Sequence, residues 1–250
     1  MRTLSVTIHS YLLVLLGLLL SSPLLAAPAL NVGGLYDYLD AERSTLLKRV
    51  RNSGDSTAFV KVSVAELVYE SDGTVREVDQ QTLPVEERGL VASPARLIIP
   101  ARGMQAIRLL YRGERDRERY FRLRFIPVLP EHNDGFALSE AQAQGYKESL
   151  QAGVNVLAGY GTLLFVTPSR VSYQTPVEQK GGSMVISNAG NATVVLDHFR
   201  QCDRKGDKCD TAIKHHLLPG RTREFSVADG RFYQFELHEG RDRRDVVVGR

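Results

Sequence analysis

The sequence predicts an all-β protein made of two antiparallel β-sandwiches in tandem. From Asn31 onward, short runs rich in Val, Leu, Ile, Phe and Tyr are separated by turn residues, which is the pattern of strands joined by hairpins. Roughly seven such runs precede Pro168 and roughly six follow it, enough for one sandwich on each side. Convincing helical periodicity occurs only in residues 138–150, so helices are expected to contribute little to the fold.

The first residues form a segment that is separate from the fold. Arg2 supplies a positive start, Tyr11–Leu20 is a leucine-rich apolar core, and small residues follow. That order predicts a secretory signal peptide over residues 1–27, cleaved after Ala27 or Ala29. The apolar run of about ten residues is shorter than the roughly 20 that cross a bilayer, so a membrane anchor is the disfavoured alternative. The mature chain is expected to be exported, with no membrane insertion, and to hold two domains.

Charge and motifs argue against several classes of function. The net charge is only +3, and basic residues alternate with acidic ones, so no nucleic-acid partner is expected. The run Arg112–Arg119 alternates in sign and is predicted to be a solvated loop. Gly159-Tyr-Gly161 is not a dinucleotide fingerprint, because Leu164 stands where the third glycine belongs. No nucleophile elbow or phosphate loop is present either, so we expect no enzymatic activity and no cofactor.

The predicted strands of the first sandwich follow one another with clear turns. In chain order they are Leu46–Val50, Phe59–Tyr69, Leu90–Ile99, Met104–Tyr111 and Tyr120–Val128. Asp72-Gly73 is a hairpin signal. Pro130–Leu150 departs from this rhythm, since it is polar, longer than a hairpin loop and weakly helical at Leu138–Gln144. Long loops of this kind are usually functional or mobile.

The stretch Gln151–Pro168 is predicted to be a long strand ended by a proline. Val154, Val156 and Ala158 share one face, because side chains alternate along a strand. Its glycines leave few side chains to pack and allow another backbone to approach closely. Such a strand is either an ordinary core strand or an edge strand that offers its backbone groups to a partner.

A short proline-containing linker, Thr167–Thr175, precedes the second sandwich. The strands predicted beyond it are Gly182–Ser187, Thr193–Arg200, Ile213–Leu218, Glu224–Val227, Phe232–Leu237 and Val246–Val248. The only two cysteines, Cys202 and Cys209, flank a polar stretch with a central glycine, and export favours a disulfide across the base of this hairpin tip. The alternative is a metal site that adds His198 and His215, but the spacing is wider than that of structural zinc sites, so no metal is expected.

Four stretches carry a resemblance to a known family: Val91–Leu109, Tyr120–Pro127, Leu46–Asn52 followed by Phe59–Val64, and Val185–Gly190. The first holds a Ser-Pro pair and ends in Ile-Arg-Leu, and the second ends in Ile-Pro. Their order resembles the periplasmic chaperones of the chaperone–usher pathway, which assemble pili. The resemblance implies two immunoglobulin-like domains in a boomerang arrangement, with residues 28–167 as the first domain and 168–250 as the second, located in the periplasm.

In that family a strand of the first domain completes a pilin subunit that lacks its own last strand. The resemblance makes Val154, Val156 and Ala158 the donated residues, and implies pilin subunits and an outer-membrane usher as partners. Self-association of the free chaperone through its edge strand stays open. The competing functions are a two-domain adhesion or structural module at the cell surface and a periplasmic metal-binding protein.

This sequence departs from the family pattern at one site. In the best-known branch an Arg and a Lys bind the carboxylate at the C-terminus of the pilin. Counting along the chain places Tyr36 and Leu163 at those positions, and neither is basic. The long loop also lacks the cysteines of the long-loop branch, so the chain resembles the alternate, alpha-fimbrial branch. Arg124 or Arg170 are the other cations that could supply such an anchor.

Overall fold

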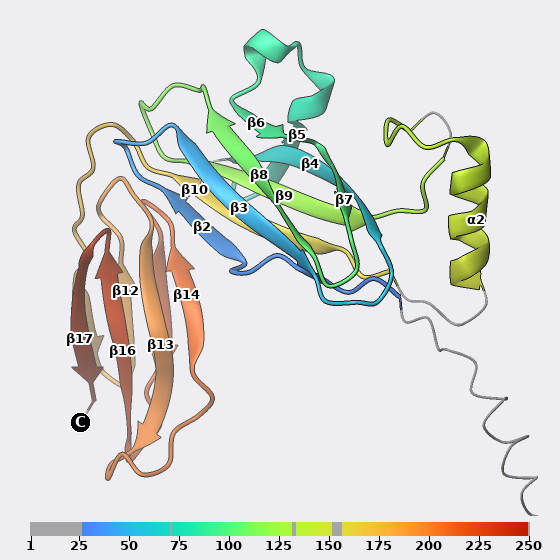
Figure 1. The fold of residues 1–250 in the computed structure, drawn as a ribbon. Coiled ribbons are helices and arrows are strands. Elements are labelled where there is room, and N and C mark those ends of the chain that lie inside the picture. The colour runs from blue at the N-terminus through green and yellow to red at the C-terminus, as the bar shows by residue number, and fades with distance from the viewer. Residues whose placement is uncertain (1–26, 71, 132–133, 152–156, 250) are drawn as a thin grey trace, which may run out of the picture.

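The computed structural model describes residues 27–70, 72–131, 134–151 and 157–249. Two β-sandwiches follow one another along the chain, and Figure 1 shows them joined at an angle. The prediction of an all-β fold with two tandem sandwiches is confirmed. The predicted signal peptide lies almost wholly outside the described residues. Within the described ranges, no helix combines the length and the apolar character needed to cross a membrane.

The first sandwich packs two sheets face to face. Sheet A has the order β1 (Leu30–Asn31), β3 (Thr45–Asn52), β8 (Met104–Tyr111) and β6 (Leu90–Ser93). Sheet B has the order β2 (Tyr36–Leu39), β10 (Tyr160–Val166), β9 (Arg119–Pro127), β4 (Ala58–Tyr69) and β5 (Val75–Asp79), and β7 (Arg96–Ile99) also pairs with β4. The predicted Asp72-Gly73 turn lies between the paired strands β4 and β5. Two short 3-10 helices, Gln80–Thr82 and Val85–Glu87, lead from β5 to β6.

The core of this sandwich follows from the two-residue period of its strands. On β9, Phe121, Leu123 and Phe125 are fully buried, while the arginines between them point outward. Ile107 and Leu109 of β8 are fully buried in the same cluster. Alternation along each strand therefore selects the face that turns toward the opposite sheet.

The second sandwich repeats this arrangement on a smaller scale. Sheet C has the order β11 (Val177–Lys180), β12 (Ser183–Ser187) and β15 (Thr222–Ser226), and sheet D has β14 (Ile213–Leu217), β13 (Val194–Asp203), β16 (Arg231–Glu239) and β17 (Asp242–Val248). Its core is separate from the first one and includes Met184, Ile186, Leu196 and Leu237. A hydrophobic core of its own is what defines each of the two domains.

The N-terminal strands cross from one sheet to the other. β1 pairs with β3 in sheet A, whereas β2 pairs in parallel with β10 in sheet B. Lys48 holds this crossing, because its Nζ donates to the Gly34 carbonyl at 2.8 Å and to Asp37 Oδ2 at 2.7 Å. The lysine is almost fully buried, and the carboxylate compensates the charge that burial would otherwise penalise.

Helix α2 (Glu140–Gln151) replaces part of the predicted loop and of the predicted long strand. The helical periodicity of residues 138–150 agrees with α2, which runs past the weakly helical middle Leu138–Gln144. The strand expected from Gln151 is wrong at Gln151, which ends this helix, and at residues 157–159, which lie in no strand; residues 152–156 lie outside the described residues. Tertiary contacts hold this helix against the first sandwich. The ring of Phe59 on β4 packs edge-on against Tyr146, at 4.8 Å between centroids, and Tyr146 also donates its hydroxyl to the Thr57 carbonyl at 2.6 Å. Figure 1 shows α2 at the end of the first domain that is remote from the second.

Candidate functional site

Strand β10 is paired along one edge and only partly along the other. All of its residues pair with β9, from Tyr160 opposite Phe125 to Val166 opposite Arg119. On the other side, β2 pairs only with the part that starts at Leu163. Among the described residues, no strand lies beside residues 160–162 on that side. We call these three residues the open edge.

The backbone direction shows which groups the open edge presents. The N–H of Leu163 donates to the Leu35 carbonyl at 2.8 Å, and the N–H of Thr167 donates to the Leu39 carbonyl at 3.1 Å. Backbone groups alternate between the two edges of a strand. Gly161 therefore presents its N–H and C=O on the same side as Leu163, where a further strand can pair with them.

The side chains of the open edge also show where the sandwich ends. Leu164 and Val166 are fully buried, Thr162 is 1% exposed, and Tyr160 is exposed. The Thr162 hydroxyl has no hydrogen-bond partner among the described residues, which costs roughly 1–3 kcal/mol for a buried group. From Val166 back to Thr162, the side chains at even positions therefore face the core. Tyr160, the next even position toward the N-terminus, lies beyond the end of the core.

The sequence-predicted binding residues precede this edge. Val154 and Val156 lie outside the described residues. Ala158 is exposed and lies just before β10, in no strand. Adjacent to it, Gly159 runs so close to β9 that a Cβ built on it would be 3.2 Å from the Phe125 carbonyl. Ala158 has the same parity as Leu164 of β10.

Tyr36 and Leu163, the two positions taken from the family pattern, are brought together by the fold. They are register partners in the parallel pairing of β2 and β10. Tyr36 is exposed, and its ring lies 4.2 Å, centroid to centroid, from that of His216 in the second domain. Of the two other cations considered for this role, Arg124 is already paired and Arg170 lies in the linker between the domains. Arg124 forms an ion pair with Glu77, at 2.5 Å between Nη2 and Oε2.

Arg170, the other alternative, lies in the linker between the domains. Its carbonyl accepts a hydrogen bond of 2.7 Å from the Asn191 side chain. A cation that does lie beside the Tyr36 position is Lys48, bound to the neighbouring Asp37, and sequence analysis missed it. Alternation on β3 was the available signal, because Lys48 has the same parity as the buried Val50.

Glu118 joins the two domains, and the sequence analysis missed it as well. The run Arg112–Arg119 was expected to be a solvated loop, which is wrong for this residue, since Glu118 is only 7% exposed. Its carboxylate accepts from the Thr193 backbone N–H at 2.9 and 3.0 Å and from Thr193 Oγ1 at 2.6 Å. Tyr120 donates its hydroxyl to the same carboxylate at 2.7 Å. Desolvation raises the pKa of Glu118, and these hydrogen bonds oppose that rise.

A stack of rings forms the second contact between the domains. The imidazole of His216 on β14 lies nearly parallel to the ring of Phe165 on β10, with centroids 4.9 Å apart. Tyr38 on β2 also stacks on Phe165, and its hydroxyl is 2.6 Å from His216 Nε2. Desolvation lowers the pKa of His216 to about 4, so the imidazole is neutral at pH 7. Glu118 and His216 together fix the second domain beside the β2–β10 edge.

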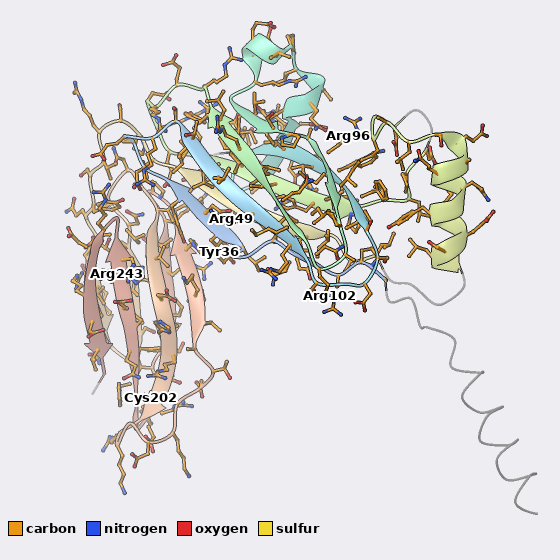
Figure 2. The ribbon with its side chains drawn as sticks, in the orientation of Figure 1. Tyr36, Arg49, Arg96, Arg102, Cys202 and Arg243 are labelled. Carbon is orange, nitrogen blue, oxygen red and sulfur yellow. A yellow bond between two sulfur atoms is a disulfide. The ribbon has the colours of Figure 1, made fainter. Side chains whose placement is uncertain are left out.

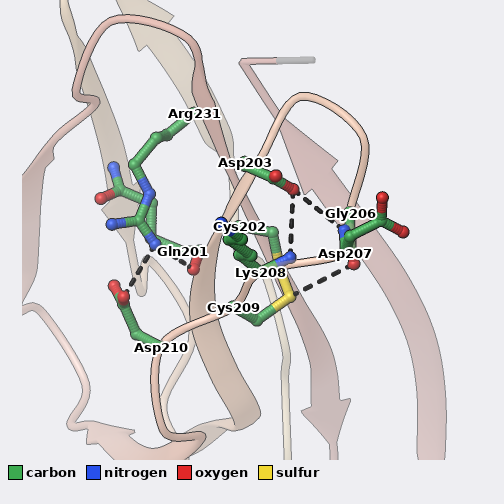
Figure 3. The surroundings of a disulfide bond; sticks show 9 residues. All are labelled: Gln201, Cys202, Asp203, Gly206, Asp207, Lys208, Cys209, Asp210 and Arg231. Carbon is green, nitrogen blue, oxygen red and sulfur yellow. Dashed lines mark hydrogen bonds and ion pairs between the residues drawn. A yellow bond between two sulfur atoms is a disulfide. The ribbon is translucent and has the colours of Figure 1, made fainter.

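The two cysteines are bonded to each other, which confirms the predicted disulfide at the hairpin tip. Figure 3 shows the turn it closes, in which the Asp203 side chain accepts from the N–H groups of Asp207 and Lys208. The alternative of a metal site at Cys202 and Cys209 is therefore wrong, because disulfide sulfurs are not thiolate ligands. No cluster in the described part of the chain has the His, Cys, Asp or Glu side chains to hold a metal ion.

Comparison with known proteins identifies the family. No family model matches the chain. The chain is 32% identical over 221 residues to the probable fimbrial chaperone EcpB of Klebsiella pneumoniae subsp. pneumoniae, covering 87% of this chain and 89% of the relative. It is 32% identical over 219 residues to the probable fimbrial chaperone EcpB of Escherichia coli O157:H7, with the same coverage of both chains.

Solved structures share the two-domain fold. The class 5 fimbriae chaperone CfaA superposes with a TM-score of 0.54 at 20% identity, over 89% of this chain and all of that one. The SafB chaperone of Salmonella enterica, solved in complex with the SafA pilin, superposes with a TM-score of 0.54 at 13% identity, over 88% and 96% of the two chains. With relatives above 30% identity that match most of its length, this chain belongs to the fimbrial chaperones, a periplasmic and non-enzymatic family that serves pilus assembly.

Proposed function

We propose that this chaperone holds pilin subunits by adding a strand to them and then delivers them to an outer-membrane usher. The open edge of β10 is the observation that carries the proposal, because it leaves the backbone groups of Gly161 without a partner strand among the described residues. Strand addition draws affinity from main-chain hydrogen bonds and register from alternate side chains. The complex of SafB with a pilin supports subunits as partners of such a chaperone.

The donated side chains that we propose are Val154, Val156 and Ala158. Their parity matches Leu164 and Val166, which fill the core of the chaperone itself. A strand that leaves the sandwich without changing register would carry its apolar face directly into the open core of a pilin. The face is small in bulk, which suits a narrow groove.

We propose that the C-terminus of the pilin is held without a pair of cations. The positions where the family has its Arg and Lys are the register partners Tyr36 and Leu163, and neither is basic. Tyr36 is an exposed aromatic beside His216, and Lys48 already binds Asp37. This absence of a basic pair, together with the lack of cysteines around the long loop, is the reason for placing the chain in the alpha-fimbrial branch. We further propose that residues 1–27 are the signal peptide, that the domains span 28–167 and 168–250, and that the free chaperone self-associates through its open edge.

The test is co-purification from the periplasm with the candidate pilin subunits. A charge in an apolar groove is strongly unfavourable, so Val156→Asp should lose the pilin. Gly161→Pro should also lose it, because proline removes the N–H that faces the open edge while the side bonded to β9 is kept. Both variants are expected to fold.

Two variants serve as matched controls. Gly161→Ala should retain the pilin, since a Cβ there meets no atom within 4 Å. Val75→Asp places the same charge on β5, at the opposite edge of the same sheet, and should also retain it. If Val156→Asp and Gly161→Pro retain the pilin as well as the wild type does, β10 and the residues before it are not the donated strand. Capture of no pilin by the wild type would favour the surface adhesion module.

A further inference from the structure

The outer face of sheet A carries arginines that the rest of the domain leaves uncompensated. Leu47, Arg49 and Arg51 are exposed on β3, and the exposed residues of β8 opposite them are Met104, Ala106, Arg108 and Leu110. Register pairs Leu47 with Arg108 and Arg51 with Met104, so opposing side chains point to the same side. We call this surface, made of those seven residues, the arginine face. Figure 2 labels Arg49 on it.

No acidic residue compensates this charge within the sheet. The four strands of sheet A contain no Asp or Glu. Within the described part of the chain, Arg49, Arg51 and Arg108 form no ion pair. The arginines of sheet B show the contrast, because Arg119 pairs with Glu66, and Arg122 and Arg124 pair with Glu77.

The apolar members of the face are exposed and lie beside the arginines on the same two strands. Leu47 is 53% and Met104 50% exposed, on strands of eight residues. Strands of this length present a surface about 26 Å long. Arg and Met are enriched in protein interfaces, whereas Lys, Glu and Asp are depleted there, and the exposed positions of β3 and β8 have this composition. A lipid-binding face would carry Trp, Tyr or Phe as interfacial anchors, and this face has none.

We propose that the arginine face docks an acidic protein surface. The positive charge of the face indicates an acidic partner, because three exposed guanidinium groups without internal ion pairs can form charge-assisted hydrogen bonds with carboxylates. The side chains of Leu47, Met104 and Leu110 supply the apolar contacts between them. The face has seven residues, fewer than the roughly 20–30 residues a side of a standard interface, so the contact belongs to the transient class of interfaces. It lies on the sheet that does not contain β10, and so it is separate from the open edge.

The test uses a fluorescein-labelled peptide of alternating Glu and Leu as the probe and measures anisotropy. The triple variant Arg49→Gln/Arg51→Gln/Arg108→Gln should weaken binding at least tenfold, and wild-type binding should weaken as salt rises. The matched control is Arg122→Gln/Arg124→Gln, whose arginines are already paired, and it should bind within twofold of the wild type. Circular dichroism should show that both variants are folded.

Three results would overturn the proposal: no binding by the wild type, equal weakening in both variants, or binding that the triple variant leaves unchanged. Sedimentation with vesicles of phosphatidylcholine and phosphatidylglycerol at 3:1 tests whether the face binds an anionic lipid surface instead of an acidic protein. Arginine-dependent binding to these vesicles, in place of the peptide, would assign the face to lipid. The triple variant should still retain pilin subunits, so failure here is distinguishable from failure of strand donation.

Discussion

Removing one hydroxyl at the domain junction should measurably destabilise the protein. Thr193→Val keeps the shape of the side chain but deletes the Oγ1 donor, which lies 2.6 Å from Glu118 Oε2. A hydrogen bond to a charged acceptor contributes about 1.5–3 kcal/mol. The Thr193 backbone N–H and the Tyr120 hydroxyl continue to satisfy the carboxylate. The expected loss of unfolding free energy is therefore at the lower end, about 1.5–2 kcal/mol.

Urea unfolding followed by circular dichroism measures this loss, since the chain has no tryptophan to serve as a fluorescence probe. Thr222→Val is the matched control. The Thr222 hydroxyl meets the Ser187 hydroxyl at 2.9 Å on the exposed surface of sheet C, and surface changes of this kind cost within about 0.5 kcal/mol.

The pH dependence adds a second check on the same bond. The pKa of Glu118 is raised by desolvation, so acid protonates this carboxyl in the folded state before an unfolded one. A neutral carboxyl is a weaker acceptor, so the penalty of Thr193→Val should shrink as pH falls through that raised pKa. The reasoning is refuted if Thr193→Val unfolds within about 0.3 kcal/mol of the wild type, the limit of additivity error, or if Thr222→Val costs as much.

Three further outcomes follow from the structure. Replacing Cys202 and Cys209 by serine opens a short loop, with a sequence separation of 7, and should cost about 2.5 kcal/mol by loop-closure entropy in urea unfolding; an unchanged midpoint would contradict this. The folded-state pKa of His216 is about 4 against an ordinary 6.5, so the unfolded chain binds the proton first as pH falls. The free energy of unfolding should therefore decrease by about 1–2 kcal/mol, after solvent screening, between pH 6.5 and 4, with no contribution above pH 6.5. The variant His216→Gln should flatten this slope of stability against pH, and an identical slope would exclude this histidine as its source. Tyr146→Phe removes the hydroxyl bonded to the Thr57 carbonyl and should release about 1 kcal/mol of local stability, seen as faster hydrogen exchange in α2 with β9 unchanged; uniform acceleration would argue against a local effect.

Local signals account for the parts of the fold that could be predicted. The alternation of Phe121, Leu123 and Phe125 with arginines identifies β9 and its buried face without any partner being known. The Asp72-Gly73 turn and the spacing of Cys202 and Cys209 likewise depend only on neighbours in the chain. Each of these predictions concerns residues within one strand or one turn.

Long-range contacts decided what the sequence left open. Alternating charge suggested that Glu118 is solvated, and only the approach of Thr193, 75 residues later, buries it. The packing of α2 against the first sandwich depends on Phe59 in β4, which no local pattern relates to Tyr146.

The sequence by itself determined two β-sandwiches, the disulfide hairpin and the face of each strand, because a two-residue period and turn chemistry are local properties. Only the tertiary structure decided that Tyr36 and Leu163 are neighbours and that β2 stops short of the start of β10. Strand register across a sheet depends on the packing of segments that are distant in the chain, and this packing left the open edge available to a partner.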